Sequence, residues 1–172
     1  MVGTLSMGSG DELVDHIDED NRVIEVVTRA RVRGENLLHR SVGIVVLNSA
    51  GEILIHRRAE DKDVWPGQWD MAAGGVVSAG ESYESAAVRE LEEEVGITGA
   101  GLRHVRDGRF HDDRVNALCR FFEARWDGPV RFNDGEVVEA LWVSVDELRR
   151  RFERDVFVPD SRSVAAEFLE GL

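Results

Sequence analysis

Cysteine is nearly absent from this chain of 172 residues. Cys119 is the single cysteine, so no disulfide can form within the chain, as is usual for proteins of a reducing compartment such as the cytoplasm. No apolar run approaches the roughly 18 residues that a membrane-spanning helix needs. Residues 1–10 also lack the charged and apolar regions of a signal peptide. We therefore expect a cytoplasmic protein that does not interact with membranes.

Positive charge is also scarce. The chain has 21 Lys and Arg against 34 Asp and Glu, which gives a net charge of −13 at pH 7. Such a chain repels nucleic acids and acidic membranes at long range. It would repel a phosphorylated substrate as well, unless a bound cation reversed the local field. The composition therefore argues against a nucleic-acid partner and favours small molecules.

No repeat, low-complexity linker or change of composition divides the chain. We expect one domain over residues 11–172, preceded by a flexible tail of residues 1–10. Apolar and β-branched runs predict strands at residues 12–17, 23–32, 42–47, 52–56, 71–77, 115–124 and 140–143. Besides the helix described next, helices are predicted at residues 146–152 and 164–169. Strands that alternate with helices indicate a layered α/β domain.

The longest predicted helix carries a dense group of carboxylates. Ser82 is a suitable N-cap, and Gly96 ends the helix as glycine does just past a helix C-terminus. At about 100° per residue, three side chains share one arc of about 100°. These are Glu90, Glu93 and Glu94. The helix thus has one strongly acidic face.

The adjacent arc of the helix is apolar, and we expect it to be buried. It consists of Ala87, Val88, Leu91 and Val95, while Glu92 points away from both arcs. Like charges three or four residues apart destabilise a helix by a few tenths of a kcal/mol per pair. Hard divalent cations are bound by several converging carboxylate oxygens, so a metal site would explain why these glutamates lie close together. The alternative is a solvated acidic surface.

A longer pattern surrounds this helix. Gly75 is followed after five residues by Glu81, and after seven more by residues 89–97, RELEEEVGI. The segment resembles the Nudix box at every defining position: Gly, five residues, Glu, seven residues, Arg-Glu-apolar-x-Glu-Glu-x-Gly-apolar. The resemblance implies the Nudix fold, an α/β/α sandwich with a central mixed β-sheet. It also implies Mg²⁺, which Mn²⁺ could replace, bound over a diphosphate.

The resemblance implies roles for single residues. Arg89 would orient the glutamates through charge-assisted hydrogen bonds and so serve catalysis. Glu93 would be both a catalytic residue and a metal ligand. The metal site as a whole would comprise Glu90, Glu93, Glu94, the backbone carbonyl of Gly74 and, in support, Glu81.

In Nudix enzymes a downstream glutamate, several residues before a Trp, often completes the site. Glu136 lies six residues before Trp142 and is our choice for a catalytic proton acceptor, with Glu139 as second choice. The alternative is that both are exposed acids beside a strand.

Residues 12–151 more widely resemble the isopentenyl-diphosphate isomerase-like branch of the Nudix proteins. In the isomerases, cations placed like Arg58 and Lys62 bind the substrate diphosphate. Alternatively, these two are surface charges paired with Glu60 and Asp61. The segments that carry the resemblance are NLLHR at 36–40, HRR at 56–58, Lys62, WPGQWD at 65–70 and NDGEV at 133–137.

The positions that isomerase catalysis requires are not kept. Ala73 stands where the isomerases have a catalytic Cys, and Val115 and Ala117 stand at the positions of their glutamates. Of the two N-terminal metal histidines, His39 remains and Val32 replaces the other. We read His39 as structural.

We therefore expect Mg²⁺-dependent hydrolysis of a nucleoside diphosphate linked to another group, most of all a nucleoside 5′-di- or triphosphate. Isomerase activity is the first alternative. An ADP-ribose or nucleotide-sugar pyrophosphatase is the second. Homodimers are common in this family, and a homodimer is possible here.

Overall fold

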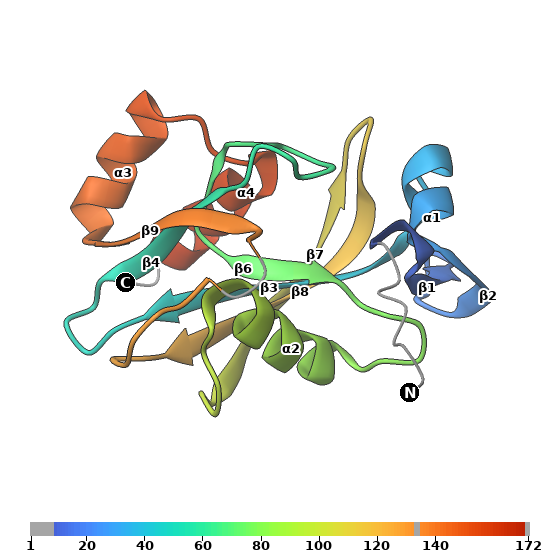
Figure 1. Cartoon of the computed structure of the whole chain (residues 1–172), viewed down its shortest axis with the longest axis horizontal. Helices are drawn as coiled ribbons and strands as arrows, with labels where there is room; N and C mark the ends of the chain where they lie inside the picture. Colours follow the sequence, from blue (N-terminus) through green and yellow to red (C-terminus); the bar gives the residue numbers. More distant parts are fainter. Residues whose placement is uncertain (1–8, 133–134, 171–172) are drawn as a thin grey trace, which may run out of the picture.

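The computed structural model describes residues 9–132 and 135–170, which form a mixed β-sheet between helices (Figure 1). In chain order the elements are η1 (Ser9–Asp11), β1 (Leu13–Ile17), β2 (Val23–Thr28), α1 (Arg29–Glu35), β3 (His39–Leu47), β4 (Ile53–Arg58), β5 (Trp69–Asp70), β6 (Ala73–Val76), α2 (Tyr83–Val95), β7 (Leu102–His111), β8 (Asn116–Arg125), β9 (Val137–Val143), α3 (Val145–Arg154) and α4 (Pro159–Glu170).

Strands β3 to β9 form the central sheet. Its main path is β5-β4-β3-β8-β7, while β6 pairs with β3 and β9 pairs with β4. β3 and β8 run parallel, from the pair His39↔Ala117 to the pair Leu47↔Arg125, and the other pairs are antiparallel. β3 meets β4 at Leu47↔Ile53, and its earlier residues pair with β6 instead. β6 is thereby held beside the middle of the sheet, directly before the acidic helix.

Apolar cores lie on both faces of this sheet. On one face, Leu91 and Val95 of α2 pack in a cluster with Ile44. On the other face, where Figure 1 shows α3 and α4, Leu148 and Phe168 belong to a second cluster. The two layers of helices and the mixed sheet confirm the α/β/α sandwich that the sequence predicted.

The hairpin of β1 and β2 is a separate sheet that contacts the loop before α2. The backbone N–H of Ala79 donates to the carbonyl oxygen of Leu13 at 2.8 Å. The N–H of Gly80 donates to Asp15 Oδ2 at 3.2 Å. These bonds fix a loop that would otherwise have few backbone partners, and so they help to position the start of the acidic helix.

One predicted strand is too long, and one observed strand was not predicted. Residues 23–32 were expected to be one strand, but β2 ends at Thr28, whose hydroxyl accepts the N–H of Arg31 at 3.3 Å and caps α1. The cap supplies a helix start that outweighs the strand preference of the Val-rich run. β7 was not predicted, because charged residues such as Arg103 and Asp107 leave it without an apolar run.

The ends of the chain complete the description. Residues 1–8 of the expected tail lie outside the described residues, as do Asn133 and Asp134 and residues 171–172. Ser9 and Gly10, also assigned to the tail, belong to η1. Within the described ranges, no helix combines the length and the apolarity needed to cross a bilayer.

Candidate active site

Helix α2 begins and ends where the sequence predicts. The Ser82 hydroxyl accepts the backbone N–H of Ser85 at 3.1 Å, which satisfies a free donor of the first turn. At the other end Gly96 has a φ of 66°, and its N–H donates to the carbonyl oxygen of Glu92 at 3.1 Å. Glycine adopts this left-handed conformation without strain. The two caps fix where the helix begins and ends.

The buried face of α2 is rotated from the expected one. Val88 was expected to be buried, but it is 49% exposed. Glu90 and Glu94 are buried instead, with 7% and 2% exposed. The reason is the position of β6, which approaches the acidic side of the helix and covers these two carboxylates. Glu93 stays exposed beside them.

Two glycines of β6 allow this close approach. Glu94 Oε2 accepts the N–H of Gly74 at 2.9 Å. A Cβ atom on Gly75 would lie 2.4 Å from Glu90 Oε1, and one on Gly74 would lie 2.1 Å from the carbonyl oxygen of Val42. A side chain at either position would therefore displace Glu90 or separate β6 from β3.

Arg89 connects the carboxylates of the site. Its Nη1 donates to Glu90 at 2.7 Å and to Glu93 at 3.1 Å. Its Nε and Nη2 donate to Glu81 at 3.0 and 2.9 Å, and Nη2 also donates to the carbonyl oxygen of Val76 at 3.1 Å. Charge-assisted bonds of this kind hold several carboxylates in fixed orientations.

The two inner carboxyl groups are hard to ionise. Burial raises the pKa of Glu90 to about 7, although the Arg89 charge acts in the opposite direction. Burial, and then repulsion from Glu90, raise the pKa of Glu94 to about 8. Two carboxylates held together in the interior are stabilised by a nearby positive charge.

The donor atoms suit a hard divalent cation. Glu90, Glu93 and Glu94 offer carboxylate oxygens from adjacent positions on one rigid helix, as Mg²⁺ requires. Within the described residues, no three His, Cys, Asp or Glu side chains already form a metal-binding group. Since Arg89 holds Glu90 and Glu93, a metal would have to replace part of these contacts.

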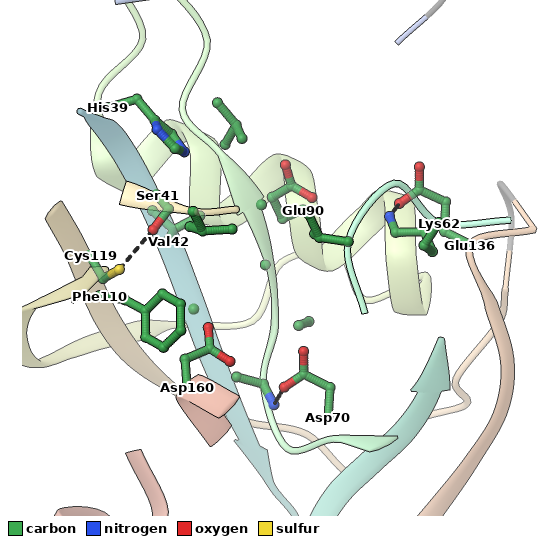
Figure 2. Close-up of a pocket in the computed structure, with 18 of the residues that line it drawn as sticks. His39, Ser41, Val42, Lys62, Asp70, Glu90, Phe110, Cys119, Glu136 and Asp160 are labelled. Atoms are coloured by element: carbon green, nitrogen blue, oxygen red, sulfur yellow. Dashed lines mark hydrogen bonds and ion pairs between the residues drawn. The ribbon is translucent and has the colours of Figure 1, made fainter. Parts of the chain in front are cut away.

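Lys62 and Glu136 come to the same place from two different loops. They form a close ion pair (Figure 2). The charge of Glu136 contributes to the raised pKa of Glu90, and that of Lys62 opposes the rise at Glu94. Glu139, our second choice, pairs instead with Arg57 at 3.4 Å. Of the two candidate acids, Glu136 is thus the one beside the acidic helix.

Arg58 lies in the interior of the protein. It is 8% exposed, and its Nη2 donates to the carbonyl oxygen of Val64 at 3.0 Å. Its Nη1 lies 3.9 Å from Asp70 Oδ2. The alternative that Arg58 and Lys62 are surface charges paired with Glu60 and Asp61 is therefore wrong, because their partners are Asp70 and Glu136.

A cavity of about 1040 Å³ joins these groups. One part of its wall carries the charged residues Lys62, Arg89, Glu90, Glu93 and Glu136. Another part carries aromatic and polar side chains, among them Trp65, Asp70, Phe110, Phe121, Asp160 and Ser161.

No motif in the sequence pointed to Asp160. It follows Pro159 at the start of α4, where an acidic residue is common for reasons of helix stability alone. Burial, and then the charge of Asp70, raise its pKa to about 7. Asp70 lay within the WPGQWD segment but had no assigned role. The fold brings the two together by pairing Trp69 of β5 with Phe157, which lies two residues before α4.

The chain belongs to the NUDIX domain family, which its sequence matches over residues 37–168. It is 40% identical over 164 residues to an uncharacterized Nudix hydrolase of Pseudomonas aeruginosa, covering 94% of this chain and 96% of that protein. YfcD, an uncharacterized Nudix hydrolase of Escherichia coli K12, is 39% identical over 163 residues, or 92% and 87% of the two chains. The crystal structure of DR0079 from Deinococcus radiodurans superimposes with a TM-score of 0.78 at 25% identity, covering 91% and 98%. The chain is thus a hydrolase of the Nudix family.

Proposed function

We propose that this chain hydrolyses a diphosphate bond in a nucleoside diphosphate linked to another group, with Mg²⁺ or Mn²⁺ as cofactor. The observation that carries the proposal is the convergence of Glu90 and Glu94, both buried, at the glycines of β6. Keeping two like charges in the interior is costly, and a divalent cation offsets that cost.

The metal would be held by Glu90, Glu93, Glu94 and the carbonyl oxygen of Gly74. When bound, it neutralises diphosphate oxygens and makes a bound water more acidic. Arg89 keeps the carboxylates in orientation, and Glu81 holds Arg89 from the opposite side. The three carboxylate ligands thus stand on one helix, and the residues around them hold them in place.

The proton acceptor in this proposal is Glu136. It lines the cavity and lies near enough to Glu90 to affect its pKa. Lys62 provides a positive charge at the same part of the wall, where a substrate phosphate would compete with Glu136 for it. Arg58 adds a second cation that lines the cavity.

Nucleoside 5′-di- and triphosphates are the substrates that we propose. The sequence has no added segment that would recognise a sugar beyond the diphosphate. The cavity volume of about 1040 Å³ lies just above the usual range for small-molecule sites, roughly 300–1,000 Å³, and leaves room for a nucleotide.

A nucleotide panel tests this function. Purified protein is incubated with nucleoside di- and triphosphates and Mg²⁺, and the products are separated by anion-exchange chromatography. We expect nucleoside monophosphates, loss of turnover in excess chelator, recovery with added Mg²⁺, and poor activity with Ca²⁺. Full turnover in excess chelator would contradict the metal mechanism, and no turnover of any nucleotide would contradict the substrate class.

A further inference from the structure

One part of the cavity plays no role in the proposed hydrolysis. It is formed on the sheet face opposite α2, where Trp65, Phe110 and Phe121 belong to the core that α3 and α4 share. The rings of Trp65 and Phe110 lie edge to face, with centroids 5.5 Å apart. Aromatic walls with a few polar groups are typical of sites for flat organic ligands.

Asp70 provides a fixed negative charge in this part of the cavity. Its Oδ1 accepts the N–H of Ala72 at 3.0 Å and the hydroxyl of Ser161 at 2.7 Å. The Ser161 oxygen in turn accepts the N–H of Met71 at 3.0 Å. Two hydrogen bonds therefore hold Oδ1 of Asp70, and Oδ2 lies 3.9 Å from Arg58 Nη1.

Asp160 has the opposite character. Among the described residues, no side chain donates a hydrogen bond to it. It lines the cavity and keeps some accessible surface, and Figure 2 shows it between Phe110 and Asp70. An enclosed carboxyl group without a side-chain donor can accept hydrogen bonds from a ligand.

We propose that this part of the cavity binds the nucleobase of the substrate, and that Asp160 selects bases with an exocyclic amino group. The inference rests on the proposed function, since it takes the ligand to be a nucleotide. When Asp160 is ionised, above its pKa of about 7, an amino group of the base donates to the carboxylate, whereas a carbonyl oxygen at the same position meets it acceptor to acceptor. Leaving such a group unpaired in an enclosed site costs much affinity.

The test compares bases that carry an amino group or a carbonyl oxygen at the same ring position, without metal, without hydrolysis and at a pH above the pKa of Asp160. Each pair also differs at the adjacent ring nitrogen, which is an acceptor beside the amino group and an N–H donor beside the carbonyl. NMR titrations in chelator give dissociation constants for CMP against UMP and for AMP against IMP. We expect the wild type to bind the amino member of each pair about tenfold more tightly or better. Asp160→Asn should bring both ratios to about one, because an amide can also donate to a carbonyl oxygen.

Two further variants make the result specific. Asp146→Asn, the same change at an exposed site on α3, should leave both ratios as in the wild type. Phe110→Leu should weaken all four nucleotides alike, because it removes aromatic contact and no hydrogen bond. Equal affinities within each pair for the wild type, or an unchanged ratio in Asp160→Asn, would overturn the proposal.

Folding and catalysis are tested separately. Asp160→Asn should melt at or above the wild-type temperature, because it removes a charge that Asp70 repels. If the protein hydrolyses the nucleotide panel but binds both members of each base pair equally, the role of Asp160 is contradicted and the proposed function stands. If the protein binds the amino bases selectively but hydrolyses no nucleotide, the proposed function is contradicted and the role of Asp160 stands.

Discussion

The four glutamates near the end of α2 differ in their surroundings although they are neighbours in sequence. Glu90 and Glu94 are buried, and Glu93 is half exposed and bonded to Arg89. Glu92 lies on the outer side of the helix and is exposed. Because the four side chains are chemically identical but differ in burial and partners, variants of them can be compared directly.

Glu94→Gln should separate stability from function. The change keeps the shape of the side chain and its bond to the N–H of Gly74, and above the Glu94 pKa of about 8 it removes a buried charge that Glu90 repels, so the comparison is made at that pH. We expect the melting temperature of the metal-free protein to rise by about 2–4 °C, the shift that roughly 1 kcal/mol produces in a chain of this size. The Mg²⁺-induced increase should be lost. Scanning calorimetry with and without Mg²⁺ checks both, and an undiminished increase in the variant would exclude Glu94 as a ligand.

His56 should make stability depend on pH. Burial lowers its pKa to about 4, while the unfolded chain titrates near 6.5. Between these values the unfolded state binds more protons, so stability is full above pH 6.5 and falls toward pH 4, by roughly 3 kcal/mol at the lower end. Urea titrations at several pH values should show a weaker acid dependence in His56→Phe. The exposed His111→Phe is the control, and equal slopes in His56→Phe and wild type would contradict the prediction.

Ala73, Val115 and Ala117 should exclude isomerase chemistry. All three are apolar and buried, and none can carry a proton. We expect no conversion of isopentenyl diphosphate to dimethylallyl diphosphate by the pure protein with Mg²⁺, measured by gas chromatography of the released alcohols. Conversion above the background of a Glu93→Gln sample would show that other residues move the protons.

At the scale of elements, the sequence predicted the features that depend only on neighbouring residues in the chain. The caps of α2, Ser82 and Gly96, act as the sequence indicated, because a cap depends on residues within one turn. The buried face of the same helix was misjudged at Val88, because it depends on where β6 lies. Residues 29–32, the start of α1, were taken for the end of a strand, because the Thr28 hydroxyl that caps the helix follows a Val-rich run.

The junction of β6 and α2 gives an element-scale prediction. A Cβ atom on Gly75 would meet Glu90 Oε1 at 2.4 Å, so Gly75→Ala must move a proposed metal ligand. Because a displacement of about 1 Å at a reacting centre can cost 10²-fold, we expect a loss of turnover of that order in a steady-state assay. Gly101→Ala, where a Cβ atom meets nothing within 4 Å, should be silent. Full activity of Gly75→Ala would show that Glu90 need not hold this position.

At the scale of the whole molecule, one cavity connects groups that are distant in sequence. The box residues Glu90 and Glu93 could be found from their spacing alone, because the motif fits within one loop and one helix. Asp160 could not, because it comes near Asp70 only through the pairing of β5 with the segment before α4. Glu136 was proposed because it lies six residues before Trp142 in the sequence. In the fold it lies beside Lys62.

The net charge of −13 also belongs to this scale. A phosphorylated substrate approaching such a surface is repelled unless cations offset the field locally. Arg58, Lys62 and Arg89 all line the cavity, and a bound divalent cation would add two more positive charges. The overall acidity of the chain and an anionic substrate are therefore compatible.

The central claim is that the acidic face of α2 binds the metal that drives hydrolysis. Its most direct test is kcat at saturating Mg²⁺ for Glu93→Gln beside Glu92→Gln, with a nucleotide that the wild type hydrolyses. We predict a loss of about 100-fold or more for Glu93→Gln, because a charged ligand is removed, and nearly wild-type turnover for Glu92→Gln. Equal losses in both variants, or no loss in either, would contradict the account.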